Sequence, residues 1–395
     1  MRRTENGHID LDLGIRAPVS RTLRVQVHQG THVIASSVAG KRKQVDDASI
    51  ENSILQARND IFDEELYHEI HREARSLTNR GVRCTGDKVL LPMGTDQQVI
   101  LDLVPTDDDT TETKDSFGGA DIAEAILIAS RILLSHAHQQ TANRRHQPPP
   151  PLVERRPPRS LYSILRPILA HLQHRSASSR TQKFLEDLGT VLAKADLNLI
   201  LENSRSRMEL SIILSTPANV HQPFVEALVD SMSAPLHSSM LLNLPTTTSQ
   251  LAIHIRTNTM GTDYKINVNT AMPDTPLSSI PADSHFTTAT DMEEHIMHLL
   301  TLDLISLIEM SSDCGGWSAT SPLTGGLSID RGADSYSRLL VLTLERDRLE
   351  LGWSGGSDAA RSSGSCFWGE IEMGFGESKG LLEMAKRIST GRSGY

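Results

Sequence analysis

The chain has 395 residues, of which 38% are hydrophobic and only 4% aromatic, so any core must be built mainly from aliphatic side chains. Its 49 acidic against 39 basic residues give a net charge of −10, which disfavours a primary role in binding DNA or RNA, because phosphate recognition needs a basic surface. Its three cysteines are far apart and form no Cys-x-x-Cys pair, so neither a disulfide framework nor a zinc knuckle is supported.

Short strands and two long helices are predicted in the first part of the chain. Leu23, Val25 and Val27 alternate with polar residues before a glycine turn and a second apolar run, which predicts a hairpin. Ser49 can cap a helix over 49–79, and Gly81 offers a left-handed end. Further along we expect strands at 88–93 and 97–105, an acidic loop at 106–115 and an amphipathic helix at 121–139.

Residues 141–159, TANRRHQPPPPLVERRPPR, form the clearest boundary. Consecutive prolines favour an extended polyproline conformation, and the flanking arginines repel one another, so this segment is interpreted as an exposed linker or long insertion. The functional alternative is that this segment is a proline-rich ligand for a small recognition domain, although PxxP patterns are common in plain linkers.

The second part of the chain again mixes helices and strands. The pattern predicts a helix at 161–174 with a kink at Pro167, a helix at 181–195, strands at 198–203, 209–215, 251–256 and 264–268, a helix near 222–232, a strong helix at 291–310, a Gly/Ser-rich loop at 311–337, a hairpin of 339–344 with 349–353, a strand at 367–373 and a final helix from about 378. Because strands and helices do not strictly alternate, we expect an α+β fold with antiparallel sheets in two subdomains, 1–140 and 160–395, joined by the Pro/Arg-rich linker.

Two motifs suggest catalysis, and each lacks a part. The run GWSGG at 352–356 matches the nucleophile elbow G-x-S-x-G, but no histidine follows Ser354 to act as its base. The run His68-Glu69-Ile70-His71 resembles a zinc-protease motif, yet its histidines are three residues apart instead of four. We therefore expect no catalytic, cofactor-binding or metal-binding residues, and a serine hydrolase using Ser354 is the enzyme alternative.

A nucleic-acid-associated adaptor is the alternative from another class of proteins. It would use the arginines in and next to the proline-rich segment, and the net charge of −10 makes direct binding the weaker hypothesis. These residues are Arg144, Arg145, Arg155, Arg156 and Arg159.

The helix expected over 49–79 carries two apolar stripes. One contains Ile50, Ile54, Ala57 and Ile61, and the other contains Leu55, Phe62, Leu66, Ile70, Ala74 and Leu77. Two stripes predict burial on two sides, with Phe62 and Leu66 in the core. The periodicity leaves open whether the second neighbour is the chain's own sheet or a partner subunit, and an ordinary amphipathic helix under a sheet is the simpler alternative.

The string ARNDIFDEELYHEIHREAR within 57–77 resembles the segment that opens the carboxy-terminal half of the Mediator subunit 17 family in its filamentous-fungal form. Flanking stretches at 15–27 and 159–175 are also similar, so the resemblance covers about 10 to 200. The residues that we single out for a structural or partner role on this helix, all but Ile70 of them at positions of the family pattern, are Arg58, Phe62, Glu65, Leu66, Ile70, Arg72 and Glu73.

The resemblance implies a nuclear, non-enzymatic scaffold or coactivator subunit of the Mediator head module. Such a subunit links regulators to RNA polymerase II and the general initiation factors, and its partners are the other head subunits. The resemblance implies no cofactor, no membrane association and no direct contact with nucleic acid. The family also has an amino-terminal helical half that this chain lacks, so we expect the chain to be a fragment or a shortened form.

Overall fold

The computed structural model divides into two compact units, Met1–Gln173 with Met208–Ala234, and His174–Arg207 with Pro235–Tyr395. The structure describes residues 2–3, 9–10, 20–37, 50–94, 96–105, 120–146, 162–204, 224–246, 249–270, 277, 280–311, 317–321, 326–331, 336–355, 363–369 and 380–390. The α+β class is confirmed, because helices occur together with sheets whose paired strands are all antiparallel.

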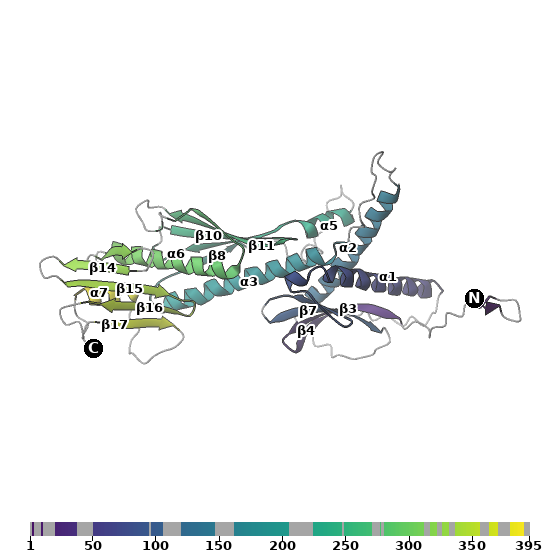
Figure 1. Cartoon of the computed structure of the whole chain (residues 1–395), viewed down its shortest axis with the longest axis horizontal. Helices are drawn as coiled ribbons and strands as arrows, with labels where there is room; N and C mark the ends of the chain where they lie inside the picture. The colour runs from purple at the N-terminus through teal and green to yellow at the C-terminus, as the bar shows by residue number, and fades with distance from the viewer. Residues whose placement is uncertain are drawn as a thin grey trace. The chain divides into compact units, whose positions relative to one another are not determined.

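Unit 1 is built on a five-stranded antiparallel sheet in the order β4–β3–β7–β6–β5. The predicted hairpin is confirmed as β3 and β4, which are joined at Gly30 with a positive φ of 59°. In this unit α1 lies along the sheet (Figure 1), and both α1 and α2 contact β3. The elements of unit 1 are β1 (Arg2–Arg3), β2 (Ile9–Asp10), β3 (Arg21–Gln29), β4 (His32–Ser36), α1 (Ile50–Ala74), η1 (Thr78–Arg80), β5 (Arg83–Thr85), β6 (Lys88–Pro92), β7 (Gln97–Pro105), α2 (Ala120–His146), the start of α3 (Leu165–Lys194) and α5 (Phe224–Ser233).

The core of unit 1 is aliphatic, as the composition predicts. Inward side chains of β3, β6 and β7 pack with α1, α2 and the start of α3, and the core includes Leu23, Val25, Leu91, Leu101, Ile126 and Leu169. The helix expected at 49–79 ends earlier, at Ala74, because the chain turns into η1. Gly81 does adopt the left-handed conformation, with φ 79°, but it closes η1 rather than α1.

The two helices expected at 161–174 and 181–195 form one continuous helix, α3, so the prediction of a kink at Pro167 is wrong. Pro167 lies in the first turn, where its missing N–H would have no partner within the helix. The serine-rich stretch that separated the two predicted helices is held by tertiary contacts: Ala177 is buried, and Ser178 shares a hydrogen bond with Ser238 of β9 (Leu236–Asn243) at 2.9 Å. The division between the two units falls inside α3.

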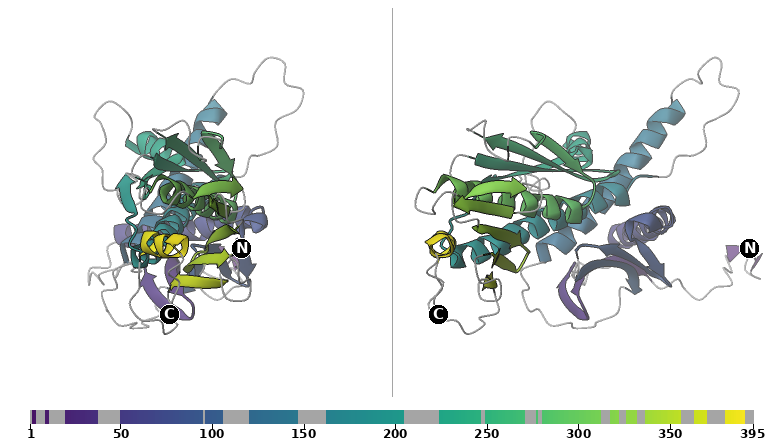
Figure 2. Two further views of the ribbon diagram at one scale, coloured as in Figure 1. Left: turned by 90° about the vertical axis from the view of Figure 1, so that its left-hand side faces the viewer. Right: turned by 60° about the vertical axis from the view of Figure 1, so that its left-hand side comes forward.

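Unit 2 holds two five-stranded antiparallel sheets, ordered β12–β11–β10–β9–β8 and β13–β14–β15–β16–β17. Helix α6 contacts β11 and β12 of one sheet and β13 and β15 of the other, so it lies between them (Figure 2). The elements are the rest of α3, β8 (Ile200–Ser204), β9 (Leu236–Asn243), β10 (Ser249–Asn258), β11 (Gly261–Thr270), β12 (Asp283–Phe286), α6 (Ala289–Met310), β13 (Ser318–Ser321), β14 (Gly326–Arg331), β15 (Tyr336–Leu344), β16 (Arg348–Ser354), β17 (Gly364–Gly369) and α7 (Leu381–Thr390).

Most of the expected elements of unit 2 are present, and one expectation is wrong. The segment 311–337 is not only a Gly/Ser-rich loop, because it contains β13 and β14, which continue the sheet outward from β15. Their residues have weak strand propensity, and pairing with β15 supplies what local preference does not. The strand expected at 209–215 and the acidic loop at 106–115 lie outside the described residues.

The Pro/Arg-rich segment is only partly described. Residues 141–146 belong to α2, and 147–159 lie outside the described residues. The subdomain boundaries at 1–140 and 160–395 therefore stay a prediction. Among the described helices, none is both long and apolar enough to cross a membrane.

Candidate structural and partner helix

The carboxy-terminal half of α1 is packed on the sheet of unit 1. Leu66, Ile70 and Ala74 have 0% exposure, and Leu77, just beyond the helix, has 3%. Phe62 is only half-buried, so the expectation that it lies in the core with Leu66 is wrong. It contacts the rim of the core and lies edge-on to the ring of His138. The helix is therefore buried along one face, and only from about Phe62 onward.

Asp63 joins three elements of unit 1. Its carboxylate is 2% exposed and accepts hydrogen bonds from the Thr22 hydroxyl (2.9 Å) and the Leu23 N–H (3.3 Å) of β3. The Arg131 guanidinium of α2 donates to the two carboxylate oxygens at 3.2 and 2.8 Å. A buried charge is tolerated only when it is paired and hydrogen-bonded, and Asp63 meets both conditions. It thus fixes where α1 lies against β3 and α2.

Glu73 forms a second joint, at the amino terminus of α3. One carboxylate oxygen accepts from the N–H groups of Ile164 and Leu165, both at 2.7 Å, and the other accepts from Arg166 N–H at 3.4 Å. The first N–H groups of a helix lack partners within it and attract negative charge. Glu73 therefore caps a helix that begins about ninety residues further along the chain.

The charge state of Glu73 is shaped by opposing effects. Burial raises the pKa of its carboxyl above the ordinary value of 4.5, while the three backbone N–H groups and the Arg166 guanidinium, 3.6 Å away, act to lower it. Desolvation is the largest of these effects. The hydrogen bonds therefore offset part of the cost of burying the carboxyl, so the contact between Glu73 and α3 is sensitive to their loss.

The remaining singled-out residues of α1 lie at the surface. Arg72 pairs with Glu69, as the i, i+3 spacing predicts, and its guanidinium stands 6.0 Å from the centre of the Tyr162 ring. Glu65 accepts from His138 at 3.0 Å, and Arg58 is exposed on the amino-terminal half of the helix. Of the seven singled-out residues, Leu66, Ile70 and Glu73 are therefore buried, and the others are exposed or half-buried.

Asp63 was not singled out from the sequence. The missed signal is its spacing. Asp63, Leu66, Ile70, Glu73 and Leu77 follow one another at intervals of three and four residues, so the two acids stand on the same helical line as the buried leucines and isoleucine. An acidic residue among the buried apolar positions of a helix needs hydrogen-bond or charge partners within the fold. Both of these acids have such partners.

The amino-terminal half of α1 has no buried face. Every side chain described between Glu51 and Asn59 is exposed. Ile54, Leu55 and Ile61 are large apolar residues with 62%, 52% and 67% exposure. The stripe of Ile50, Ile54, Ala57 and Ile61 is here called the outer stripe. Its residues Ile54, Ala57 and Ile61 are exposed, so burial of α1 on both sides is not observed among the residues that the structure describes.

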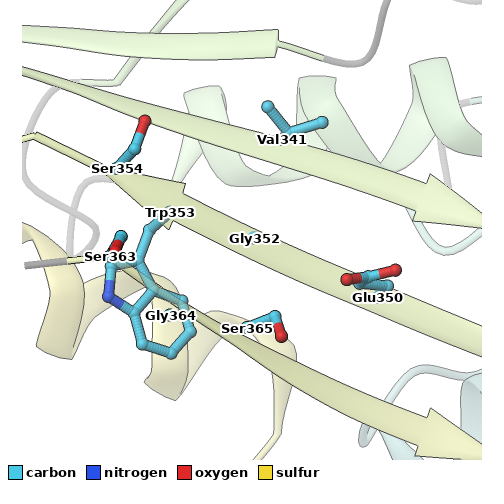
Figure 3. A pocket seen from close by; sticks show the side chains of 8 residues that line it. All are labelled: Val341, Glu350, Gly352, Trp353, Ser354, Ser363, Gly364 and Ser365. Carbon is cyan, nitrogen blue, oxygen red and sulfur yellow. The ribbon is translucent and has the colours of Figure 1, made fainter.

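The surroundings of Ser354 differ from those of a nucleophile elbow. Ser354 ends β16 and lies in an antiparallel ladder, not at a strand-to-helix elbow. It borders a surface cavity of about 390 Å³, where the Trp353 ring packs on Gly364 (Figure 3). Glu350 lines the other end, about 13 Å along the strand at ~3.3 Å per residue. The lining, which contains no histidine, is Val341, Glu350, Gly352, Trp353, Ser354, Ser363, Gly364 and Ser365.

Within the part of the chain that is described, the side chains of the other sequence motifs do not come together as a functional site. No three His, Cys, Asp or Glu side chains come together there as a metal site. The rings of His68 and His71 instead lie near the Tyr67 ring in tilted orientations, with centroids 6.3 and 6.0 Å away. Arg144 and Arg145 are exposed at the end of α2, whereas Arg155, Arg156 and Arg159 lie outside the described residues.

Comparison with known proteins gives a consistent result. A family model described as Subunit 17 of Mediator complex matches residues 1–192. The Mediator of RNA polymerase II transcription subunit 17 of Emericella nidulans is 33% identical over 365 residues, which cover 89% of this chain and 56% of that protein. The protein of the same name from Aspergillus terreus is 36% identical over 346 residues, or 83% of this chain and 53% of its own length. The chain thus spans about half the length of the curated relatives it matches.

Similar chains also occur among solved structures. A chain in the structure of the Schizosaccharomyces pombe Mediator head module superposes with a TM-score of 0.48 and 16% sequence identity. The superposition covers 71% of this chain and 60% of the other.

Proposed function

Because the chain belongs to the Mediator subunit 17 family, we propose that it acts as a non-enzymatic scaffold of the Mediator head module in the nucleus. In this role it holds other head subunits together and links regulators to RNA polymerase II and the general initiation factors. We propose no catalytic role and no cofactor for it.

One observation carries the proposal. Helix α1 carries the string that resembles the family, and its side chains serve architecture: Asp63 and Glu73 are buried and bind neighbouring elements, while Ile54 and Ile61 of the outer stripe are exposed. A helix anchored at one end and exposed at the other is typical of a subunit that binds other proteins. Ser354, the nucleophile of the enzyme alternative, has only serines, glycines, a valine, a tryptophan and a distant glutamate around its cavity.

Co-purification tests the proposal. A tagged form of the chain, expressed in a filamentous fungus, is recovered from nuclear extract, and the head subunits and RNA polymerase II are quantified by mass spectrometry. We expect all other head subunits at near-equal amounts, with polymerase enriched over an untagged control. Recovery of the chain without other head subunits would contradict the proposal. Labelling of Ser354 by a fluorophosphonate, abolished by Ser354→Ala, would instead support the hydrolase.

A further inference from the structure

The outer stripe of α1 has the spacing of a coiled-coil seam. Its residues, Ile50, Ile54, Ala57 and Ile61, follow one another at intervals of four, three and four. Alternating three- and four-residue spacing places side chains along one line that fits the grooves of a second helix. Flat sheets and extended peptides do not require this spacing, so the pattern favours a helix as the occupant.

The sheet of unit 1 does not cover the outer stripe. At about 100° per residue, Ile54 and Ile61 fall within about 20° of each other and on the side of α1 opposite Leu66 and Ile70. Leu66 and Ile70 are packed with the sheet, whereas Ile54 and Ile61 are 62% and 67% exposed. The sequence periodicity left open whether the second neighbour of α1 is the chain's own sheet or a partner subunit. Because the sheet covers the opposite face of α1, it is not the neighbour of the outer stripe.

The exposed half of α1 also needs support. Helical segments shorter than ~12–15 residues are marginal in water, and their stability in proteins comes mostly from packing of an apolar face. Between Glu51 and Asn59 no described side chain is buried. These turns extend from a helix that Asp63 holds firmly, so they present a preformed but uncovered line of aliphatic groups.

The charged residues beside the outer stripe indicate which charge the partner helix should carry. Glu51 and Arg58 lie on one flank, Asp60 lies on the other, and Glu64 takes the next position in line after Ile61. Negative charge therefore predominates along the edges of the stripe. Charged positions beside a coiled-coil seam select partners with opposite charge.

We propose that the outer stripe of α1 docks an amphipathic helix of another Mediator head subunit, with aliphatic residues at three- and four-residue spacing and basic residues on its flanks. The proposal rests on the proposed function and specifies its contact: α1 is anchored to unit 1 through its inner face and recruits the partner helix through its outer face.

Leu55 supplies a matched control on the same helical turn. Its side chain is 52% exposed, close to the 62% of Ile54, but it lies on the inner side of α1, off the outer stripe. The chain and its variants Ile54→Asp, Ile61→Asp and Leu55→Asp are co-expressed with the other head subunits, and the recovered complexes are quantified. Circular dichroism of each isolated variant checks that the fold is kept.

We expect Ile54→Asp and Ile61→Asp each to reduce recovery of the partner subunit at least tenfold, and Leu55→Asp to change it less than twofold. Wild-type recovery of all three variants overturns the docking surface while leaving the proposed function intact. An equal loss in Leu55→Asp also overturns it, because the effect then does not follow the stripe. Failure of the wild-type chain itself to assemble overturns both proposals.

A photo-crosslinker placed at Ile54 identifies the occupant. In the assembled complex we expect crosslinks to residues three or four apart on one helix of another subunit. A crosslinked dimer of this chain would identify a second copy as the occupant, and crosslinks confined to the same chain would identify one of its own segments. Either result overturns the proposal.

Discussion

Glu73 illustrates how one side chain can connect distant parts of this sequence. Its carboxylate is 1% exposed and accepts three backbone N–H groups at the start of α3. Glu73→Ala leaves these donors without their partner, and we expect it to lower the free energy of unfolding of unit 1 by about 2–4 kcal/mol. Urea denaturation followed by circular dichroism measures the change.

Two further variants at the same helix sharpen this prediction. Glu73→Gln keeps an acceptor oxygen and should lose about half as much stability. Glu69→Ala removes an acid whose partner Arg72 is 48% exposed, and should cost less than about 0.5 kcal/mol. Equal losses in Glu73→Ala and Glu69→Ala would show that capping of α3 by Glu73 does not stabilise the unit.

Asp303 gives unit 2 a pH dependence of its own. Burial raises the pKa of its carboxyl from 3.8 to about 6, although the Thr246 hydroxyl and N–H donate to it and act to lower the pKa. Since the folded pKa exceeds the unfolded one, this group contributes stability that is fully present below about pH 4 and is lost as the pH rises through about 6.

We therefore expect the unfolding free energy of unit 2 in the wild type, relative to Asp303→Asn, to rise by up to about 3 kcal/mol between pH 7 and pH 4. Denaturant titrations at both pH values measure the difference. Asp283→Asn serves as control, because Asp283 lies 57% exposed beside Lys265 and should show little such change. Parallel pH profiles for the wild type and Asp303→Asn would refute the assignment.

At the scale of elements, Asp63 and Arg131 couple α1 to α2. A double-mutant cycle of Asp63→Asn and Arg131→Met should give a coupling energy of about 1 kcal/mol, limited by the 42% exposure of the arginine side chain. The Glu383–Arg387 pair on α7, with both partners exposed, should give less than about 0.5 kcal/mol. A coupling no larger than that of the α7 pair would show that Asp63 is held by β3 alone.

Two substitutions in α3 test whether the position of a proline within a helix determines its effect on stability. Pro167→Ala should change stability by less than about 1 kcal/mol, because the first turn loses no internal hydrogen bond to proline. Ser179→Pro, at an exposed position in the helix interior, should cost about 3 kcal/mol. Thermal denaturation distinguishes the two variants. A large loss in Pro167→Ala would mean that the proline itself shapes the start of α3.

Whether a feature of this fold could be predicted depends largely on how far apart in the sequence its interacting residues lie. The hairpin of β3 and β4, α6 and the hairpin of β15 and β16 carry strong local periodicity and were predicted. The joining of α3 and the roles of Asp63 and Glu73 depend on partners distant in the chain. Local patterns contain no information on such partners, except where an acid falls on an apolar line of a helix. The strands β13 and β14 were missed for another reason: their residues have weak strand propensity, and each is held by pairing with the next strand.

At the scale of the whole molecule, family membership and the two faces of α1 lead to the same account. The inner face carries Leu66, Ile70 and Glu73 into unit 1, and Ile54 and Ile61 of the outer stripe are exposed. Family resemblance had suggested an assembly role that periodicity alone could not distinguish from ordinary packing. The opposite orientation of the two stripes is the observation on which we base the proposed docking surface.

The most direct test of the scaffold role is reconstitution. The purified chain is mixed with head subunits assembled without subunit 17, and the mass of the product is measured by size-exclusion chromatography with light scattering. We predict a single peak whose mass exceeds that of the starting assembly by one copy of this chain. Separate elution of the chain, with the mass of the other subunits unchanged, would contradict the account.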